Sequence, residues 1–428
     1  MKSDALDLNA RLKIERLGAR GEGVARVSRG LVFVPYALAG ETILAEVDGE
    51  RGKLVELIEA SPDRVAPFCR YYGECGGCAV QTLRSPAYLA WKRSIVLDAM
   101  RNAAVEAPVQ DIVDAHGAGR RRVVFHARSA FRGPRVGFMR ARAHEIVEID
   151  ACPLLAPALQ NAPAIAAEIA RHLDALGKPL DIAVTATDGG LDIDLRGCGP
   201  LEFALSQKLV ALATDRDLAR ISNHGVAIIE RRQPHLALGR ADLVLPAGAF
   251  LQATTEGEQA LAALVLGEVA GFGKIADLFS GVGTFALRLA ATAEVHAVEH
   301  DGAALAALSR AARNTHGLKR VTTETRDLFR RPLQRAELAA FDAVVFDPPR
   351  AGAEAQAQEL AASDVPLVIG VSCNAQTFAR DAKLLVDGGY ALERVTPVDQ
   401  FRHSPHVELV GVFRRAARKR AKKGLLSR

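Results

Sequence analysis

From about residue 240 onward, short apolar runs alternate with longer stretches that have a helical pattern. Apolar runs of this length predict buried strands, and strands that alternate with helices predict a parallel sheet. We therefore expect an α/β fold of the Rossmann-like, doubly wound kind, with ligands at the carboxyl ends of its strands. The expected strands span 274–279, 294–299, 321–325, 341–346, 366–372, 392–398 and 407–413.

The residues before this region have two other patterns. Within the first sixty residues, short strands are separated by evenly spaced glycines, which predicts a small closed barrel similar to an OB fold. The next stretch mixes strands and helices, as an α+β domain does. The sequence therefore predicts four segments, namely a barrel at 1–61, a central α+β domain at 62–236, the doubly wound domain at 237–413 and a tail at 414–428.

Composition narrows the class of protein. Hydrophobic residues make up 49% of the 428 positions and charged residues 25%, which is typical of a globular chain and excludes a disordered one. No run of about eighteen uncharged apolar residues predicts a membrane span, and the N-terminus lacks the apolar core of a secretory signal. We expect a cytoplasmic protein, monomeric, without a membrane partner, whose clustered cysteines bind metal or act in catalysis.

The net charge of +5 is unevenly distributed. Residues 414–428 hold eight Lys or Arg and no acid, so the rest of the chain carries −3. Residues 120–142 hold eight Arg and no acid, interleaved with Phe125, Phe131 and Phe138. A disordered basic tail would explain the charge of residues 414–428. An RNA-binding segment that combines phosphate contacts with base stacking would explain the pattern of residues 120–142. A solvated hairpin with scattered Arg is the alternative for the second segment.

A glycine-rich turn follows the first strand of the doubly wound region. Gly281, Gly283 and Ala286 satisfy the G-x-G-x-x-A pattern, so a dinucleotide such as NAD or FAD has to be considered. Glu299 ends the next strand, where an acid can accept hydrogen bonds from both ribose hydroxyls. Asp327 follows the third strand, where it can meet an adenine or, alternatively, cap a helix.

Two further segments carry candidate chemistry. Asp347 begins an Asp-Pro-Pro-Arg sequence whose prolines stiffen the chain at the sheet's ligand edge. Cys373 ends the following strand at the same edge, and Glu408 begins the last strand. A thiolate that adds to C6 of uracil would turn C5 into a nucleophile towards a sulfonium methyl, and a base would then remove the C5 proton. Cys373 and Glu408 are the residue types that these two roles need.

With these motifs in order along the chain, the sequence resembles the bacterial RNA uracil-C5 methyltransferases, specifically the iron–sulfur-containing 23S rRNA enzymes. The resemblance covers nearly the whole chain and rests on 250–252, 277–285, 347–350, 372–374 and 406–408. It implies that Cys373 is the nucleophile and Glu408 the proton acceptor. It also implies contacts to S-adenosylmethionine from Gln252, Phe279, Thr284, Glu299, Asp327 and Asp347. The chain departs from the usual pattern at Thr254, Thr284 and Arg402.

Four further cysteines form a second candidate site. Cys69, Cys75 and Cys78 lie within ten residues, and Cys152 precedes a proline. Their chemistry allows tetrahedral zinc or a [4Fe–4S] cluster, and the family resemblance favours the cluster. We expect it to have a structural role, since methyl transfer needs no electron. Cys198 has no assigned role.

The first sixty residues also resemble a TRAM domain, an RNA-binding barrel. This domain argues for 23S rRNA as the substrate and against the tRNA enzyme of the same family, which lacks the barrel and the cluster. A tRNA uridine-C5 methyltransferase therefore remains as an alternative. Two other classes remain as well, an iron–sulfur flavin or nicotinamide oxidoreductase and a non-catalytic RNA-binding factor of ribosome assembly.

Overall fold

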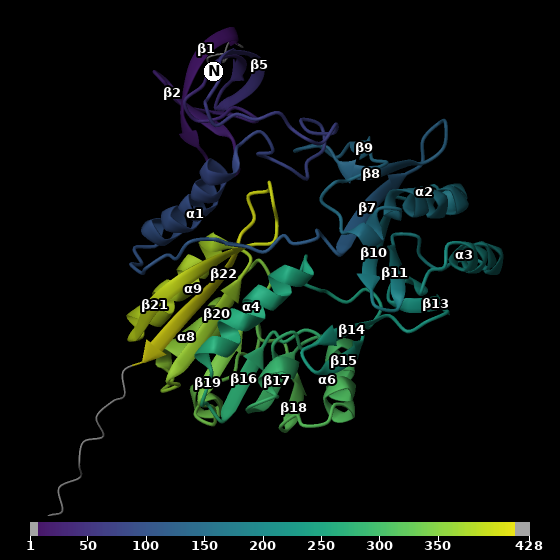
Figure 1. Cartoon of the computed structure of the whole chain (residues 1–428), viewed down its shortest axis with the longest axis vertical. Coiled ribbons are helices and arrows are strands. Elements are labelled where there is room, and N and C mark those ends of the chain that lie inside the picture. Colours follow the sequence, from purple (N-terminus) through teal and green to yellow (C-terminus); the bar gives the residue numbers. More distant parts are fainter. Residues whose placement is uncertain (1–6, 416–428) are drawn as a thin grey trace, which may run out of the picture. The chain divides into compact units, whose positions relative to one another are not determined.

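A computed structural model of the protein describes residues 7–415 (Figure 1). Contacts divide the chain into two compact units, and each is discontinuous in sequence. Unit 1 comprises Met1–Leu97, Asp111–Ala260 and Pro397–Val407, and unit 2 comprises Asp98–Gln110, Leu261–Thr396 and Glu408–Arg428. A search of the described helices finds none with the length and apolar character that a membrane crossing requires.

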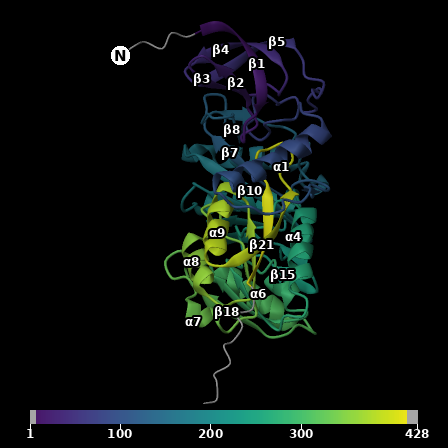
Figure 2. The ribbon, with the colours of Figure 1, turned by 90° about the vertical axis from the view of Figure 1, so that its left-hand side faces the viewer.

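The N-terminal part of unit 1 is a closed five-stranded barrel, as the glycine spacing predicts (Figure 2). Leu12, Ile14, Val32, Val34 and Ile43 fill its interior, because alternate residues of each strand point inward. The strand order is β1-β2-β3-β5-β4. The strands are β1 (Asp7–Leu17), β2 (Gly23–Val27), β3 (Gly30–Val34), β4 (Thr42–Asp48) and β5 (Arg51–Glu59).

A seven-stranded sheet forms the rest of the core of unit 1, and two helices contribute to its apolar cluster. Its order is β13-β12-β11-β10-β7-β8-β9. The elements are β7 (Arg122–Arg128), β8 (Arg135–Met139), β9 (Ile146–Glu148), α2 (Ala162–Leu173), β10 (Leu180–Thr187), β11 (Gly190–Arg196), α3 (Phe203–Asp215), β12 (Arg220–Asn223) and β13 (Val226–Glu230). Helix α3 and strand β12 are absent from the sequence-based prediction. A short hairpin follows, formed by β14 (His235–Leu238) and β15 (Ala241–Val244).

Unit 2 has the predicted doubly wound sheet, with the order β18-β17-β16-β19-β20-β22-β21 (Figure 1). The strands are β16 (Lys274–Leu278), β17 (Glu294–Glu299), β18 (Val321–Thr325), β19 (Ala343–Phe346), β20 (Leu367–Ser372), β21 (Tyr390–Asp399) and β22 (Glu408–Arg415). The helices between them are α5 (Ala286–Leu289), α6 (Gly302–Asn314), α7 (Arg335–Leu338), α8 (Glu354–Ala362) and α9 (Ala375–Asp387). Two helices, α1 (Ser85–Asn102) and α4 (Thr255–Glu268), cross the boundary between the units in sequence.

Strand β16 is the point where the direction of winding reverses. It pairs in parallel with β17 on one side and β19 on the other. In such sheets, ligands bind outside the carboxyl ends of the strands that flank this point. The last residues of β21 belong to unit 1 and pair with the short strand β6 (Val113–Asp114).

The last strand extends two residues into the predicted tail. Arg414 belongs to β22 and donates to Glu268 and Glu393, and the guanidinium of Arg415 lies 4.2 Å from the centre of the Tyr390 ring. The sequence-based expectation of a disordered tail is therefore wrong for these two residues, because the pairing with β20 continues through Arg414. The remainder of the predicted tail, 416–428, lies outside the described residues.

Candidate functional site

The glycine turn after β16 has the backbone strain of a tight turn. Gly283 has φ +96°, and a Cβ added there would come within 2.7 Å of Leu308 on α6. Glycine is required here both for the conformation and for the approach of the helix. Phe279 has φ +58°, which is a costly conformation for a bulky residue. The turn is therefore held by its surroundings rather than by local preference.

Glu299 fixes this turn to the end of β17. One carboxylate oxygen accepts the amide of Gly281 at 3.0 Å, and the other accepts those of His300 at 2.7 Å and Asp301 at 3.0 Å. Its side chain is only 17% exposed. Oε1 already accepts two amides, whereas Oε2 accepts one, so Oε2 can still receive a ribose hydroxyl.

The end of β18 presents an acid and an aromatic ring. Asp327 accepts the amide of Phe329 at 3.0 Å within a turn, and no helix begins there, so the helix-capping alternative is wrong. The rings of Phe279 and Phe329 lie 5.4 Å apart, and Phe329 is 48% exposed. Phe329 is absent from the predicted site residues, and its only sequence signal is its position two residues after Asp327. Thr284 lies in the glycine turn and is partly exposed.

Two carboxylates lie at the ends of the central strands. Asp277 is fully buried, and neither oxygen makes a hydrogen bond in the structure. Burial, followed by the charge of Asp347, raises its pKa well above the usual range. Burial also raises the pKa of Asp347 to about 7. Desolvation thus gives this edge of the sheet two acids that resist ionisation, a common property of functional sites.

Cys373 and Glu408 face each other across neighbouring strands. Strands β20 and β22 are antiparallel, and their pairing ends with Ser372 and Leu409. The same register, continued by one position, sets Cys373 opposite Glu408, whose charge acts on the thiol. Glu408 is 3% exposed, whereas Cys373 is partly exposed. Burial raises the pKa of Cys373 to about 12, and the charges of Glu408 and Asp347 add to this effect, while Arg350 opposes it. In the protein alone, the thiol is therefore protonated at neutral pH.

The backbone around Cys373 is fixed by the residue that follows it. Asn374 caps helix α9, since its side-chain oxygen accepts the amide of Gln376 at 3.0 Å. Its side-chain amide donates to the carbonyl of Arg350 at 3.1 Å. The cap therefore joins the Ser-Cys-Asn segment to the Asp-Pro-Pro-Arg segment. From the sequence, Arg350 is only part of the motif that carries the family resemblance. In the structure, its positive charge also lowers the pKa of Cys373.

Gln252 belongs to unit 1, unlike the other five predicted cofactor residues. It is 4% exposed, and its side-chain oxygen accepts the Gln400 amide at 2.7 Å. The Gln400 oxygen accepts the backbone amide of Ala253 at 2.9 Å. Thr254, which stands where the family usually has Asn, is fully buried and donates to the carbonyl of Ala115 at 2.7 Å. These contacts fix the Gln252 segment within unit 1.

A buried lysine, which the sequence did not indicate, holds the loop that leads into Glu408. Lys92 has no exposed surface, and it donates to Asp399 at 2.8 Å and to the backbone carbonyls of Phe401 and His406. The hydroxyl of Tyr88 also donates to Asp399. The loop between β21 and β22 is therefore held by a buried ion pair and by two carbonyl contacts.

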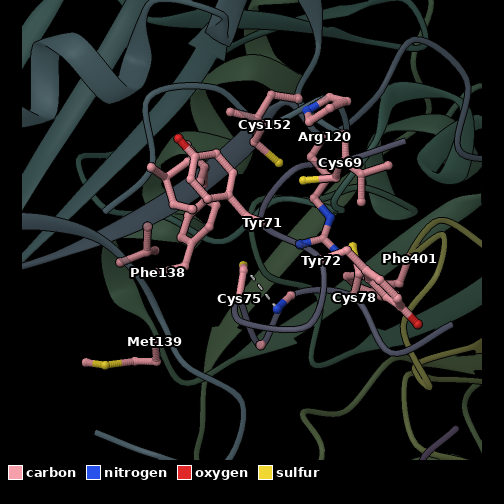
Figure 3. A pocket seen from close by; sticks show the side chains of 18 of the residues that line it. Cys69, Tyr71, Tyr72, Cys75, Cys78, Arg120, Phe138, Met139, Cys152 and Phe401 are labelled. Carbon is pink, nitrogen blue, oxygen red and sulfur yellow. Dashed lines mark hydrogen bonds between the residues drawn. The ribbon is translucent and has the colours of Figure 1, made fainter. Parts of the chain in front are cut away.

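The four predicted cluster cysteines line one cavity of unit 1, with a volume of about 490 Å³. Figure 3 shows their sulfur atoms directed towards a common space, with the side chain of Arg120 among them. Burial raises the pKa of Cys75, Cys78 and Cys152, and the thiols interact with one another. Arg120 opposes the effect of burial at all three.

The spacing of these thiols bears on the kind of group that they can hold. Within residues 7–415, no three His, Cys, Asp or Glu side chains are close enough to hold a single metal ion. The structure therefore gives no support to a preformed zinc site. The four ligands of a cubane lie on four different irons, so their sulfur atoms stand farther apart than the ligands of one ion. Four thiolates are the donor set that such a cluster takes, and its presence stays a prediction.

The basic segment at 120–142 differs from the expectation. Phe125 is fully buried, and its ring stacks on that of Phe138 at 5.3 Å. Phe125 belongs to the core of the seven-stranded sheet, because alternate residues of β7 point inward. Phe138 on β8 is only partly buried against that core and lines the cavity of the four cysteines. The prediction that the ring stacks on RNA bases is therefore wrong for Phe125 and stays a prediction for Phe138. Phe131, in contrast, is 103% exposed.

Comparison with known proteins gives the family. A sequence profile described as tRNA (Uracil-5-)-methyltransferase matches residues 265–417. An uncharacterized RNA methyltransferase of Brucella suis is 46% identical over 402 residues, which cover 94% of this chain and 97% of the relative. A 23S rRNA (uracil(1939)-C(5))-methyltransferase of Halomonas elongata is 35% identical over 432 residues, which cover 93% of this chain and 88% of the relative.

Among solved structures, the tRNA (uracil-54, C5)-methyltransferase of Pyrococcus abyssi, in complex with S-adenosyl-L-homocysteine, matches with a TM-score of 0.73 at 23% identity. The match covers 94% of this chain and 99% of that one. A tRNA enzyme thus shares the fold over nearly the whole chain, so the fold by itself does not decide between an rRNA and a tRNA substrate. The Brucella suis relative is named as an RNA methyltransferase, and the Halomonas elongata relative is named for C5 of uracil. The chain therefore belongs to the family of S-adenosylmethionine-dependent RNA uracil-C5 methyltransferases.

Proposed function

We propose that this protein transfers a methyl group from S-adenosylmethionine to C5 of a specific uridine in 23S rRNA, with Cys373 as nucleophile and Glu408 as base. The pairing register that opposes Cys373 and Glu408 at the ligand edge of the sheet is the observation that supports it best. Cys373 is the only cysteine of unit 2, so no other thiol of that unit can be the nucleophile.

The cofactor residues divide by chemistry. Glu299 accepts a ribose hydroxyl, and Asp327 with Phe279 receives the adenine. Thr284 and the glycine turn approach the methionine part, and Asp347 and Gln252 are the remaining polar contacts. This assignment is supported by the positions of Glu299, Asp327 and Asp347 at the ends of β17, β18 and β19.

The reaction begins when the Cys373 sulfur bonds to C6 of the uridine and the C5–C6 π electrons move towards O4. C5 then bonds to the methyl carbon, whose bond to the sulfonium sulfur breaks. Glu408 takes the C5 proton, the electrons of that bond re-form the C5–C6 double bond, and the C6–sulfur bond breaks to release Cys373. The target uridine has to leave its base stack to reach Cys373.

Because the pKa of Cys373 is high, the formation of the thiolate is a step that the reaction with RNA must include. The thiol is protonated at neutral pH, so it has to lose its proton before or during addition to C6. Cys373 is only partly buried, so the proton can leave to water. Arg350 is the cation that favours the thiolate, which gives this residue a function in activating Cys373.

A 23S rRNA substrate is favoured over tRNA by the Halomonas elongata relative, which is 35% identical and named for 23S rRNA. The experiment that tests the choice incubates the purified protein with rRNA and tRNA from a strain that lacks the gene, using methyl-labelled S-adenosylmethionine. Nucleoside mass spectrometry then maps 5-methyluridine. Label at one site of 23S rRNA is expected. Label in tRNA alone would establish the tRNA activity instead, and label in neither would refute the proposal.

The four clustered cysteines fit a [4Fe–4S] cluster held by Cys69, Cys75, Cys78 and Cys152, and we propose this assignment. When bound, the cluster would join the segment at 69–78 to Cys152 and so fix this part of unit 1. Cys152→Ser should lower the iron content of protein purified without oxygen, because it removes one of four ligands. Cys198→Ser is the matched control, since Cys198 is buried elsewhere in the core and should leave the iron content unchanged. Equal iron in both variants would contradict the assignment.

A further inference from the structure

The hairpin turn between β7 and β8 exposes an aromatic side chain at its apex. The amide of Gly133 donates to the carbonyl of Ala130 at 3.1 Å, which closes a β-turn with Phe131 and Arg132 at its two central positions. Central turn positions favour Gly, Pro, Asn, Asp and Ser, because these residues suit the turn's backbone conformation or form hydrogen bonds with the nearby backbone, and Phe does neither. Phe131 is 103% exposed and gains no packing within the protein.

The charges near this apex are unbalanced, in contrast to the rest of the basic segment. Most of its arginines are satisfied within the protein. Arg121 pairs with Glu258, Arg135 with Glu148, Arg140 with Glu145 and Arg142 with Glu22, while Arg122 is desolvated and interacts with Asp194.

Arg128 and Arg132 are different. Both are exposed, and no hydrogen bond or ion pair of their side chains occurs within the described part of the chain. Arg128 also lies opposite Arg135 across the β7–β8 pair, so two like charges meet at the base of the turn. The apex therefore combines one uncovered ring with two uncompensated cations.

We propose that this apex, formed by Arg128, Phe131 and Arg132, is an RNA contact in which Phe131 stacks on an unpaired base and the two arginines contact neighbouring phosphates. The inference rests on the proposed function for the identity of the RNA. An aromatic ring between cations suits a single-stranded or looped nucleic acid, because every base offers a π face and the backbone is anionic. A protein partner would instead require an apolar patch, and one ring surrounded by cations is a poor one.

The test compares Phe131→Ala and Phe131→Trp with the wild-type protein for binding to a 23S rRNA fragment that contains the target uridine. Loss of a stacked ring should raise the Kd about five- to one-hundred-fold in the alanine variant. The tryptophan variant should retain wild-type affinity, because its ring also stacks. Phe203→Ala is the matched control, since Phe203 is 79% exposed at the start of α3 and lies outside the basic segment.

Salt dependence separates the two kinds of contact. Arg132→Ala should reduce the slope of log Kd against log salt by about 0.7, as expected for one phosphate on single-stranded RNA. Phe131→Ala should leave the slope unchanged. All four variants should keep the wild-type melting temperature, because the substituted side chains are exposed.

Methylation kinetics distinguish a failure of this inference from a failure of the proposed function. Phe131→Ala should raise the KM for RNA and leave kcat at saturating RNA unchanged. An unchanged Kd in Phe131→Ala would overturn the inference even if the wild-type protein methylates 23S rRNA. An equal loss of RNA affinity in Phe203→Ala would also overturn the inference. A Phe131→Ala variant that binds RNA normally but fails to associate with a protein would overturn it as well. If the wild-type protein methylates no uridine, the binding comparison still decides the role of the apex.

Discussion

Replacement of Glu408 by Gln should make Cys373 easier to alkylate. The charge of Glu408 is the largest electrostatic contribution after burial that holds the pKa of Cys373 at about 12. Only the thiolate reacts with iodoacetamide. At pH 8, a thiol with pKa about 9 is ionised to roughly one part in ten, and one with pKa about 12 to roughly one part in ten thousand. Wild-type Cys373 should therefore react about a thousandfold more slowly than an ordinary exposed cysteine.

Removal of one like charge at close range lowers a pKa by about one unit or more, so Glu408→Gln should speed alkylation of Cys373 at pH 8 about tenfold or more. The rate is measured for the Cys373 peptide by mass spectrometry at several pH values. The wild-type rate should rise tenfold per pH unit through pH 10 without a plateau. Glu294→Gln is the control, because Glu294 is exposed at the opposite, amino end of β17. A wild-type midpoint near pH 9, or no acceleration in Glu408→Gln, would refute the reasoning.

Two further predictions concern stability. Lys92→Met should lower the free energy of unfolding by about 3–5 kcal/mol in urea, because Asp399 would remain buried without its cation. The double variant Lys92→Met with Asp399→Leu should recover much of this loss, and a single-variant loss below about 1 kcal/mol would contradict the account. Asp347 should destabilise the fold as pH rises from about 4 to about 7, because burial raises its folded-state pKa to about 7 and the unfolded chain releases its proton first. The free energy of unfolding of the wild type minus that of Asp347→Asn should fall across this window, and a rise would contradict the sign.

The sequence predicted the fold of unit 2 and the positions of its candidate site residues well. Each motif follows an apolar run, and the carboxyl ends of parallel strands meet at one edge, so a local pattern was sufficient to bring Glu299, Asp347 and Cys373 to that edge. The position of Glu408 at the start of β22 was also predicted, since an apolar run follows it, whereas the pairing of this strand with β20 was not. The pairing of this strand with β20 then sets Glu408 against Cys373.

Other features could not be predicted, because they depend on contacts between distant parts of the chain. Lys92 and Asp399 are 307 residues apart in sequence, and neither lies in a motif. The burial of Phe125 depends on which face of the seven-stranded sheet the helices cover, and the Arg-Phe interleaving concealed it. Helix α3 was missed because its apolar residues are spread around the helix rather than gathered on one face, and because its start carries no side-chain cap.

The central claim is covalent catalysis by Cys373 with proton removal by Glu408. The most direct test incubates Glu408→Gln with S-adenosylmethionine and 23S rRNA, denatures and digests the mixture, and searches for nucleotides on protein peptides by mass spectrometry. The account predicts an adduct of methylated uridine on Cys373, since methyl transfer proceeds but the C5 proton stays. It also predicts no adduct and no methylation with Cys373→Ala. Full methylation by Cys373→Ala, or an adduct on another residue, would contradict it.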